Sequence, residues 1–324
     1  MVACNRFAGV LQIPKKIMTL TIVGTMAFDA IETPFAKTDK TVGGSGTYGA
    51  FAASNFTHDI NQVSIIGGDF PKEILQELNR RGVHTDGVEM IKDKKSFFWS
   101  GKYRSDMNTR DTLITDLNVL ADFNPVIPES YQNTDYLFLA NMDPHIQKSV
   151  ILQLKKRPKF ILLDTMNFWM GATLPALHEV LQLTDALVVN DEEARQLSGE
   201  YSIAKAAKKI LHMGPQYLII KKGEHGALLF YGEQAFFAPA LLLDDVYDPT
   251  GAGDSFAGGF IGYLSKTDDI SFENLKTAII MGSVTASFCV EELGTQKLRS
   301  ITQNDIQLRT KKFLELTRFE IPQC

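Results

Sequence analysis

The run Asp248-Pro-Thr-Gly-Ala-Gly-Asp-Ser-Phe-Ala-Gly-Gly-Phe260 is the most informative stretch of this chain of 324 residues. From Phe256 onward its large apolar residues recur every four positions, which predicts a helix that begins within the run. Gly251 and Gly253 can adopt backbone angles that turn successive N–H groups toward one point. Because the first N–H groups of a helix lack partners and the helix dipole is positive at this end, the run predicts an anion site.

Asp254 lies in the first turn of this predicted helix, beside the anion site. A carboxylate does not fit simple storage of a phosphate, since like charges repel. It fits a base that takes the proton from a hydroxyl group, which then attacks the phosphate, as in a kinase. The alternative is an ordinary strand-to-helix turn, because aspartate is also favoured near a helix N-cap.

The whole run resembles the signature of the ribokinase (PfkB) family of carbohydrate kinases. In that family the second aspartate of the motif is the catalytic base, and the Gly-Ala-Gly backbone is the anion hole. The resemblance therefore implies Asp254 as the base, Gly251, Ala252 and Gly253 as the anion hole, and Thr250 beside the ATP. It implies ATP and Mg²⁺ as cofactors and leaves a monovalent cation open. The chain has no Gly-x-x-x-x-Gly-Lys-Ser/Thr pattern, so a P-loop enzyme is excluded.

Strand-like apolar runs alternate with amphipathic helical segments along most of the chain. The predicted strands are residues 20–23, 63–66, 136–139, 160–163, 186–189 and 217–220. The predicted helices between and after them are residues 72–81, 145–156, 174–183, 192–197, 203–212, 272–290 and 304–318. This alternation predicts an α/β fold with a mainly parallel central sheet and helices on both faces, as in ribokinase-like proteins.

Two segments interrupt the alternation. Residues 33–42 are polar and charged, and residues 96–117 are rich in aromatic and β-branched side chains, which favour strands. The resemblance implies that both segments form a small β lid over the carboxyl edge of the sheet. The predicted domains are an α/β core, this lid and a peripheral N-terminal extension; the core takes residues 19–32, 43–95 and 118–324, and the extension residues 1–18.

Composition narrows the class of protein. Hydrophobic residues make up 44% of the chain, which suits one large α/β domain. The formal net charge of −5 gives no footprint for nucleic acid, and no apolar window is long enough to predict a membrane helix. Cys4, Cys289 and Cys324 lie far apart without disulfide or metal spacing, which predicts a reducing, cytoplasmic setting. The expected partners are small molecules, with a homodimer left open.

Residues 43–49 read Gly-Gly-Ser-Gly-Thr-Tyr-Gly and contain a Gly-x-Gly-x-x-Gly pattern, and Asp69 follows downstream. This pattern is typical of a dinucleotide-binding turn, so an NAD-dependent dehydrogenase is an alternative. Such a turn directly follows the first strand, however, and the first predicted strand ends far upstream, at Gly24. The context therefore counts against the dehydrogenase.

The same stretch resembles the family's N-terminal Gly-Gly signature, which contacts the sugar. The resemblance implies Gly43, Gly44 and Tyr48 as substrate-binding residues. Ribokinases usually carry lysine and asparagine at the positions of Ser45 and Tyr48, and this departure counts against ribose itself as the acceptor.

Three further residues are candidate ligands of the acceptor. Asp29 follows the first predicted strand, and ligands of open α/β sheets bind at the carboxyl ends of strands. Its two oxygens can accept hydrogen bonds from neighbouring hydroxyl groups of a sugar, although a turn cap is the alternative. Asn141 and Asn167 follow later predicted strands and are expected to contact the acceptor as well.

Asn190 and Glu193 fit the family's Asn-x-x-Glu motif, which handles magnesium and phosphate through bound water. Mg²⁺ prefers oxygen ligands and retains waters, so Glu193 is the predicted metal residue and Asn190 an ATP residue. The alternative is a helix N-cap followed by acidic first-turn residues. Lys221, Gly223 and Ser283 are the other predicted ATP residues, with solvated lysine and close helix packing as alternatives.

The sequence thus predicts an ATP- and Mg²⁺-dependent kinase that phosphorylates the hydroxymethyl group of a sugar of the ribose or fructose type. A nucleoside kinase of the adenosine type is the alternative, because aromatic Phe97, Phe98 and Trp99 could stack on a base. A non-catalytic sugar- or nucleotide-binding protein is a further alternative from another class, against which the presence of Asp254 argues.

Overall fold

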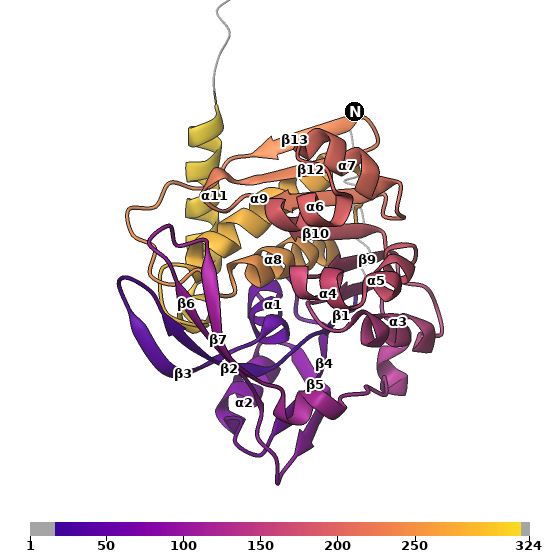
Figure 1. Cartoon of the computed structure of the whole chain (residues 1–324), viewed down its shortest axis with the longest axis vertical. Coiled ribbons are helices and arrows are strands. Elements are labelled where there is room, and N and C mark those ends of the chain that lie inside the picture. Colours follow the sequence, from indigo (N-terminus) through magenta and orange to yellow (C-terminus); the bar gives the residue numbers. More distant parts are fainter. Residues whose placement is uncertain (1–16, 319–324) are drawn as a thin grey trace, which may run out of the picture.

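The computed structural model describes residues 17–318, which form two β-sheets and their covering helices (Figure 1). The larger sheet has nine strands in the order β13-β12-β11-β10-β9-β8-β1-β4-β5. The strands from β5 to β11 in this order are parallel, and β12 and β13 add an antiparallel hairpin at one edge. The bounds are β1 Leu20–Val23, β4 Ile60–Gly67, β5 Val83–Ile91, β8 Tyr136–Leu139, β9 Phe160–Asp164, β10 Ala186–Asn190, β11 Tyr217–Lys221, β12 Ala227–Tyr231 and β13 Gln234–Ala238.

Successive residues of the central strands enter two separate cores. In β8, Tyr136 and Phe138 pack into one core, whereas Leu137 and Leu139 pack into the other. The first face carries α1 Ser45–Ala53, α2 Lys72–Arg80, α8 Ala252–Thr267, α9 Phe272–Cys289, α10 Gln296–Ser300 and α11 Gln303–Thr317. The second carries α3 Pro144–Gln153, α4 Asn167–Ala172, α5 Leu174–Leu181, α6 Asp191–Ser198 and α7 Ile203–Leu211. The predicted mainly parallel sheet with helices on both faces is confirmed.

The smaller sheet is the lid, and it lies at the lower left of Figure 1. Its strand order is β3-β2-β6-β7, with β2 Ala27–Glu32, β3 Lys37–Gly43, β6 Phe97–Tyr103 and β7 Arg110–Asp116. The sequence predicts residues 27–32 in the core, whereas they form lid strand β2 and pair with β3 and β6. Because β2 is largely buried and follows β1 after a short turn, its sequence reads like a continuation of the first core strand.

The predicted N-terminal extension, residues 1–18, lies outside the described residues except for Ile17 and Met18. Met18 is buried in the first core, and its carbonyl oxygen accepts a hydrogen bond from Ser265 Oγ at 3.0 Å. Met18 therefore packs as part of the core. Within residues 17–318, each helix is too short or too polar to cross a membrane.

Candidate active site

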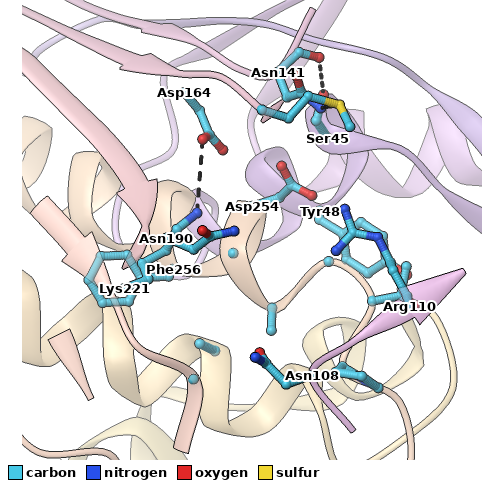
Figure 2. Close-up of a pocket in the computed structure, with 18 of the residues that line it drawn as sticks. Ser45, Tyr48, Asn108, Arg110, Asn141, Asp164, Asn190, Lys221, Asp254 and Phe256 are labelled. Atoms are coloured by element: carbon cyan, nitrogen blue, oxygen red, sulfur yellow. Dashed lines mark hydrogen bonds and ion pairs between the residues drawn. The ribbon is translucent and has the colours of Figure 1, made fainter. Parts of the chain in front are cut away.

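A cavity of about 2520 Å³ lies between the carboxyl ends of the parallel strands and the lid sheet (Figure 2). Asp164 at the end of β9, Asn190 at the end of β10 and Lys221 at the end of β11 line it, which is where open α/β sheets bind ligands. Of the site residues predicted from the sequence, all line this cavity except Gly43. Residues that are far apart in the chain are thus brought to one site.

The N-terminus of α8 forms one wall of the cavity. Gly251 is its N-cap, with a φ of 75°, and Ser255 N donates to its carbonyl oxygen at 2.8 Å. A β-carbon at position 251 would lie 2.4 Å from the Tyr48 ring, so both the left-handed backbone and the space require glycine. The first-turn N–H groups of α8 have no carbonyl partner four residues earlier within the helix; Ala252 N donates to the carbonyl oxygen of Pro249 at 3.2 Å, and Gly253 N faces the helix end. The predicted anion site therefore has the expected backbone geometry.

Asp248, the first residue of the signature, holds the signature loop in place. Its side chain is fully buried and accepts hydrogen bonds from Thr250 N at 2.8 Å and Gly294 N at 2.9 Å. Thr250 Oγ1 in turn donates to the hydroxyl of Tyr103, on lid strand β6, at 3.1 Å. The loop that carries the anion site is thereby tied to the lid.

The Asp254 carboxyl group lines the cavity at the start of α8 (Figure 2). Burial raises the pKa of Asp254 to about 7, and the neighbouring carboxylates Asp164 and Glu193 act in the same direction. The cations Lys221 and Arg110 oppose this shift. A carboxyl group with a pKa near neutrality can both accept and release a proton, as a general base must.

Asp164 is a site residue that the sequence analysis missed. It ends β9, is 4% exposed, and accepts a hydrogen bond from Thr165 N at 2.9 Å. Lys221 Nζ lies 3.9 Å from Asp164 Oδ1, and a β-carbon at Gly253 would lie 2.8 Å from that same Nζ. Burial raises the pKa of Asp164, and Lys221 opposes the rise. The lysine is therefore held between a buried carboxylate and the anion site, not solvated.

Asn190 and Glu193 form a capping box at the start of α6. Asn190 Oδ1 accepts from Glu193 N, and Glu193 Oε2 accepts from Asn190 N, both at 2.8 Å. The helix-cap alternative is thus realised, although both side chains also line the cavity. Burial raises the pKa of Glu193, opposed by Lys221. A role in metal binding remains a prediction for this pair.

The residues present fit a magnesium ion that is held through water and phosphate. Within residues 17–318, no group of three or more His, Cys, Asp or Glu side chains could hold a metal ion by itself. Mg²⁺ is usually bound by one or two carboxylates together with waters and substrate phosphates, not by an all-protein cage. Glu193 and Asp254, which face the same cavity, could supply such carboxylates.

Asp29, in lid strand β2, also lines the cavity and is 4% exposed. Burial raises the pKa of Asp29 to about 8, with further contributions from the negative charges of Asp248 and Asp254, and a hydrogen bond from Gly44 N opposes the rise. A β-carbon at Gly43 would lie 1.9 Å from Asp29 Oδ2. Gly43 therefore makes room for the Asp29 carboxyl group instead of lining the cavity.

The other predicted acceptor residues have different surroundings. Tyr48 is buried, and its hydroxyl has no hydrogen-bond partner in the described part of the chain. Asn141 accepts a hydrogen bond from Trp169 Nε1 at 3.0 Å and donates to Met166 Sδ at 3.2 Å. Asn167 is exposed at the start of α4 and lines the cavity.

The turn after β11 borders the cavity at its other end. Gly223 opens this turn with a φ of 55°, and Asn108 Oδ1 of the lid lies 3.4 Å from the place a β-carbon would take. Ser283 of α9, which is 9% exposed, lines the cavity next to the small residues Ala286 and Ser287. The small side chains leave space along α9, as a bound nucleotide would need.

A two-sheet α/β fold with a partly buried acid beside an anion site at one helix N-terminus, beneath a β lid, defines a ribokinase-like kinase. The family model "pfkB family carbohydrate kinase" matches residues 20–302, and the chain belongs to this family. It is a sugar or nucleoside kinase that binds ATP, as predicted from the signature. The dehydrogenase interpretation is wrong: the Gly-x-Gly-x-x-Gly pattern follows β3, an antiparallel edge strand of the lid, and not a parallel strand of the main sheet.

Three relatives illustrate the similarity. A cytidine kinase from Thermococcus kodakarensis is 26% identical over 254 residues, which cover 77% of this chain and 90% of that protein. The crystal structure of a nucleoside kinase from Methanocaldococcus jannaschii superimposes with a TM-score of 0.73 at 21% identity, covering 92% of this chain and 99% of that one. A protein described as ribokinase II from E. coli, in complex with ATP and Mg²⁺, gives a TM-score of 0.74 at 18% identity, covering 91% and 99%.

The raised pKa of Asp254 predicts a pH profile. Because the base acts in its ionised form, kcat/KM for ATP at saturating acceptor should rise with pH through about 7 and then level off. Asp164→Asn removes a nearby negative charge and leaves Lys221 without its partner carboxylate, and both changes lower the pKa of Asp254. The acidic limb of the profile should therefore move to lower pH. A limb that stays in place or moves upward in this variant would contradict the assignment.

The raised pKa of Asp29 predicts a pH-dependent stability. The ionised form of Asp29 is disfavoured in the folded protein. Its contribution to the free energy of unfolding is therefore fully present below the ordinary pKa of 3.8 and is lost as the pH rises to about 8. Without ligands, Asp29→Asn should therefore gain thermal stability relative to the wild type as the pH rises across this window. Thermal unfolding followed by circular dichroism at several pH values would measure the difference, with the exposed Asp39→Asn as control. A difference that is constant with pH would refute the prediction.

Proposed function

We propose that this kinase transfers the γ-phosphoryl group of ATP to the hydroxymethyl group of a nucleoside. The observation that carries the phosphoryl transfer is the position of Asp254, a partly buried carboxyl group with a pKa near neutrality at the N-terminus of α8. The acceptor hydroxyl would lie beside this carboxylate, and the γ-phosphate would lie against the N–H groups of Gly251 to Gly253.

In the proposed reaction Asp254 takes the proton of the acceptor hydroxyl. The resulting oxygen forms a bond to the γ-phosphorus while the bond from that phosphorus to the β–γ bridging oxygen breaks, so ADP leaves with the electron pair. The N–H groups at the start of α8 stabilise the charge on the transferred phosphoryl group. Bound Mg²⁺ would supply further charge neutralisation, and Glu193 and Asn190 would hold it through water.

One cation and a turn are suited to the ATP side of the site. Lys221 Nζ lies close to Gly253, at the edge of the anion site, and Asp164 keeps it there. Gly223 and Ser283 border the adjoining space, which we assign to the rest of the nucleotide. On the acceptor side, Asp29 would accept hydrogen bonds from two neighbouring hydroxyl groups of a ribose.

A nucleoside is favoured over a free sugar by aromatic side chains on two sides of the cavity. Phe97 and Trp99 of the lid line it, and so do Phe168 and Trp169 of α4, whose ring centroids are 4.8 Å apart. Flat aromatic surfaces stack on a nucleobase. The similarity of this chain to a cytidine kinase, which covers 90% of that protein, supports this choice. A free sugar, which the sequence favours, is the second candidate, because Asp29 would bind its hydroxyl groups equally well.

The test is ADP release from MgATP over a panel of nucleosides and the corresponding free sugars. We expect at least one nucleoside to stimulate ADP release, and its 5′-deoxy analogue to inhibit competitively without stimulating. Stimulation by free sugars alone would overturn the nucleoside and leave the sugar as acceptor. Equal turnover with the 5′-deoxy analogue would overturn the hydroxymethyl group as the site of transfer.

A further inference from the structure

Arg110 is a lid residue whose charge is directed at the proposed reaction centre. It is the first residue of β7 and lines the cavity. Figure 2 shows its guanidinium group pointing into the cavity on the same side as the Asp254 carboxyl group. Its positive charge lowers the pKa values of Asp254 and Glu193 against the rise caused by burial, so it is close to both the base and the proposed magnesium residue.

Arg110 has no ion-pair partner within 4.0 Å among residues 17–318. A second arginine of the same hairpin shows the usual arrangement: Arg104 Nη2 lies 2.8 Å from Asp111 Oδ1, on the exposed surface. The Arg110 guanidinium carbon instead lies 5.9 Å from the Trp99 ring centroid, which orients it by a cation–π contact. An oriented guanidinium group without a carboxylate partner, inside a cavity that binds ATP, is suited to an anion of the ligand.

The hairpin that carries Arg110 is tied to the site by one hydrogen bond and approaches it at a second point. Arg110 stands opposite Tyr103 in the β6–β7 register, and the Tyr103 hydroxyl accepts the hydrogen bond from Thr250 of the signature loop. At the tip of the hairpin, Asn108 Oδ1 lies 3.4 Å from the place a β-carbon of Gly223 would take, so the tip approaches the turn after β11. In the hairpin, Arg110 therefore lies between the hydrogen bond to the signature loop and the approach to the turn after β11.

We propose that Arg110 is a catalytic residue that contacts the oxygens of the phosphoryl group during its transfer. The inference rests on the proposed phosphoryl transfer. The transferred group moves from ADP to the acceptor with negative charge on its three outer oxygens, in a site that already contains Asp164, Glu193 and Asp254. The N–H groups of α8 face this group from the core, and Arg110 faces it from the lid. A planar guanidinium group can donate two parallel hydrogen bonds to such oxygens.

The kinetic test uses Arg110→Ala and Arg110→Lys, with Arg104→Ala as the matched control on the same hairpin. We expect Arg110→Ala to lower kcat by about 10²–10³-fold, with the KM of the acceptor within about threefold. Arg110→Lys should recover only part of the rate, because an ammonium group lacks the planar fork. Added guanidinium ion should restore part of the rate of Arg110→Ala, and Arg104→Ala should remain close to the wild type. A loss confined to the KM of the acceptor would place Arg110 on the acceptor and overturn the proposal.

A binding measurement tests the same contact without turnover. ADP with aluminium fluoride and Mg²⁺ mimics the transferring phosphoryl group, and calorimetry compares its affinity with that of ADP alone. We expect Arg110→Ala to weaken the mimic by about 10²-fold and ADP by no more than about threefold. Equal effects on both ligands, or none, would overturn the role of Arg110. Failure of every acceptor with the wild type would instead count against the proposed function, and the binding test of Arg110 would still stand.

Discussion

Asp254→Asn is expected to lower kcat by about 10³-fold while ATP affinity stays within about threefold. Asparagine has nearly the same shape but cannot accept the proton of the acceptor hydroxyl. The loss should therefore appear in the chemical step and not in binding. Because the variant removes a carboxyl group whose ionised form is disfavoured in the folded protein, its thermal stability near neutral pH should equal or exceed that of the wild type.

Steady-state kinetics with the stimulating acceptor, together with calorimetric titration of ATP, measure this prediction. Asp39→Asn provides the matched control, because it makes the same chemical change at an exposed position of lid strand β3. A kcat for Asp254→Asn within a few-fold of the wild type would refute its role as the base.

Gly251→Ala should be the most damaging of the single-methyl additions to the signature loop. Residue 251 has a φ of 75°, and its β-carbon would lie 2.4 Å from the Tyr48 ring. The left-handed backbone and the overpacking together should destabilise the fold by about 2–4 kcal/mol. The added methyl group should also displace the anion site by up to about 1 Å, which should lower kcat by about 10²-fold.

Gly232→Ala separates the two causes. Gly232 has a φ of 54° in the turn between β12 and β13, but nothing lies within 4 Å of a β-carbon there. This control should lose about 1 kcal/mol of stability from the backbone alone and keep full activity. Chemical denaturation measures the free energy of unfolding of both variants. If both lose the same amount and Gly251→Ala keeps its kcat, the close contact with Tyr48 is not the reason for glycine at position 251.

The central strands could be predicted because their environment is simple. Strands β1 and β8 are buried on both faces, so each is a short, continuous apolar run, and both were predicted with their observed bounds. Strand β5 was missed because it is half-exposed at the sheet edge and contains polar residues and Gly87. Strand β2 was assigned to the core because it is largely buried and follows β1 after a short turn, so its sequence does not distinguish it from a core strand.

The part of the site whose residues are adjacent in the sequence could be predicted. The signature carries the anion site, the base and the helix start within thirteen consecutive residues, 248–260. Asp164 was missed, although it directly follows a predicted strand at the carboxyl edge, the criterion that did select Asp29 and Asn141. Arg110 carried no local signal at all, because its approach to Asp254 depends on how the lid hairpin folds over the sheet.

The most direct test of phosphoryl transfer to a hydroxymethyl group is proton-coupled phosphorus NMR of the product formed from ATP and a stimulating nucleoside. A phosphate ester on a CH₂–O group couples to two protons, so we predict a triplet that appears together with ADP and is absent with Asp254→Asn. A doublet would place the ester on a secondary hydroxyl group. Inorganic phosphate alone would mean that water is the acceptor, and either result would contradict the proposed reaction.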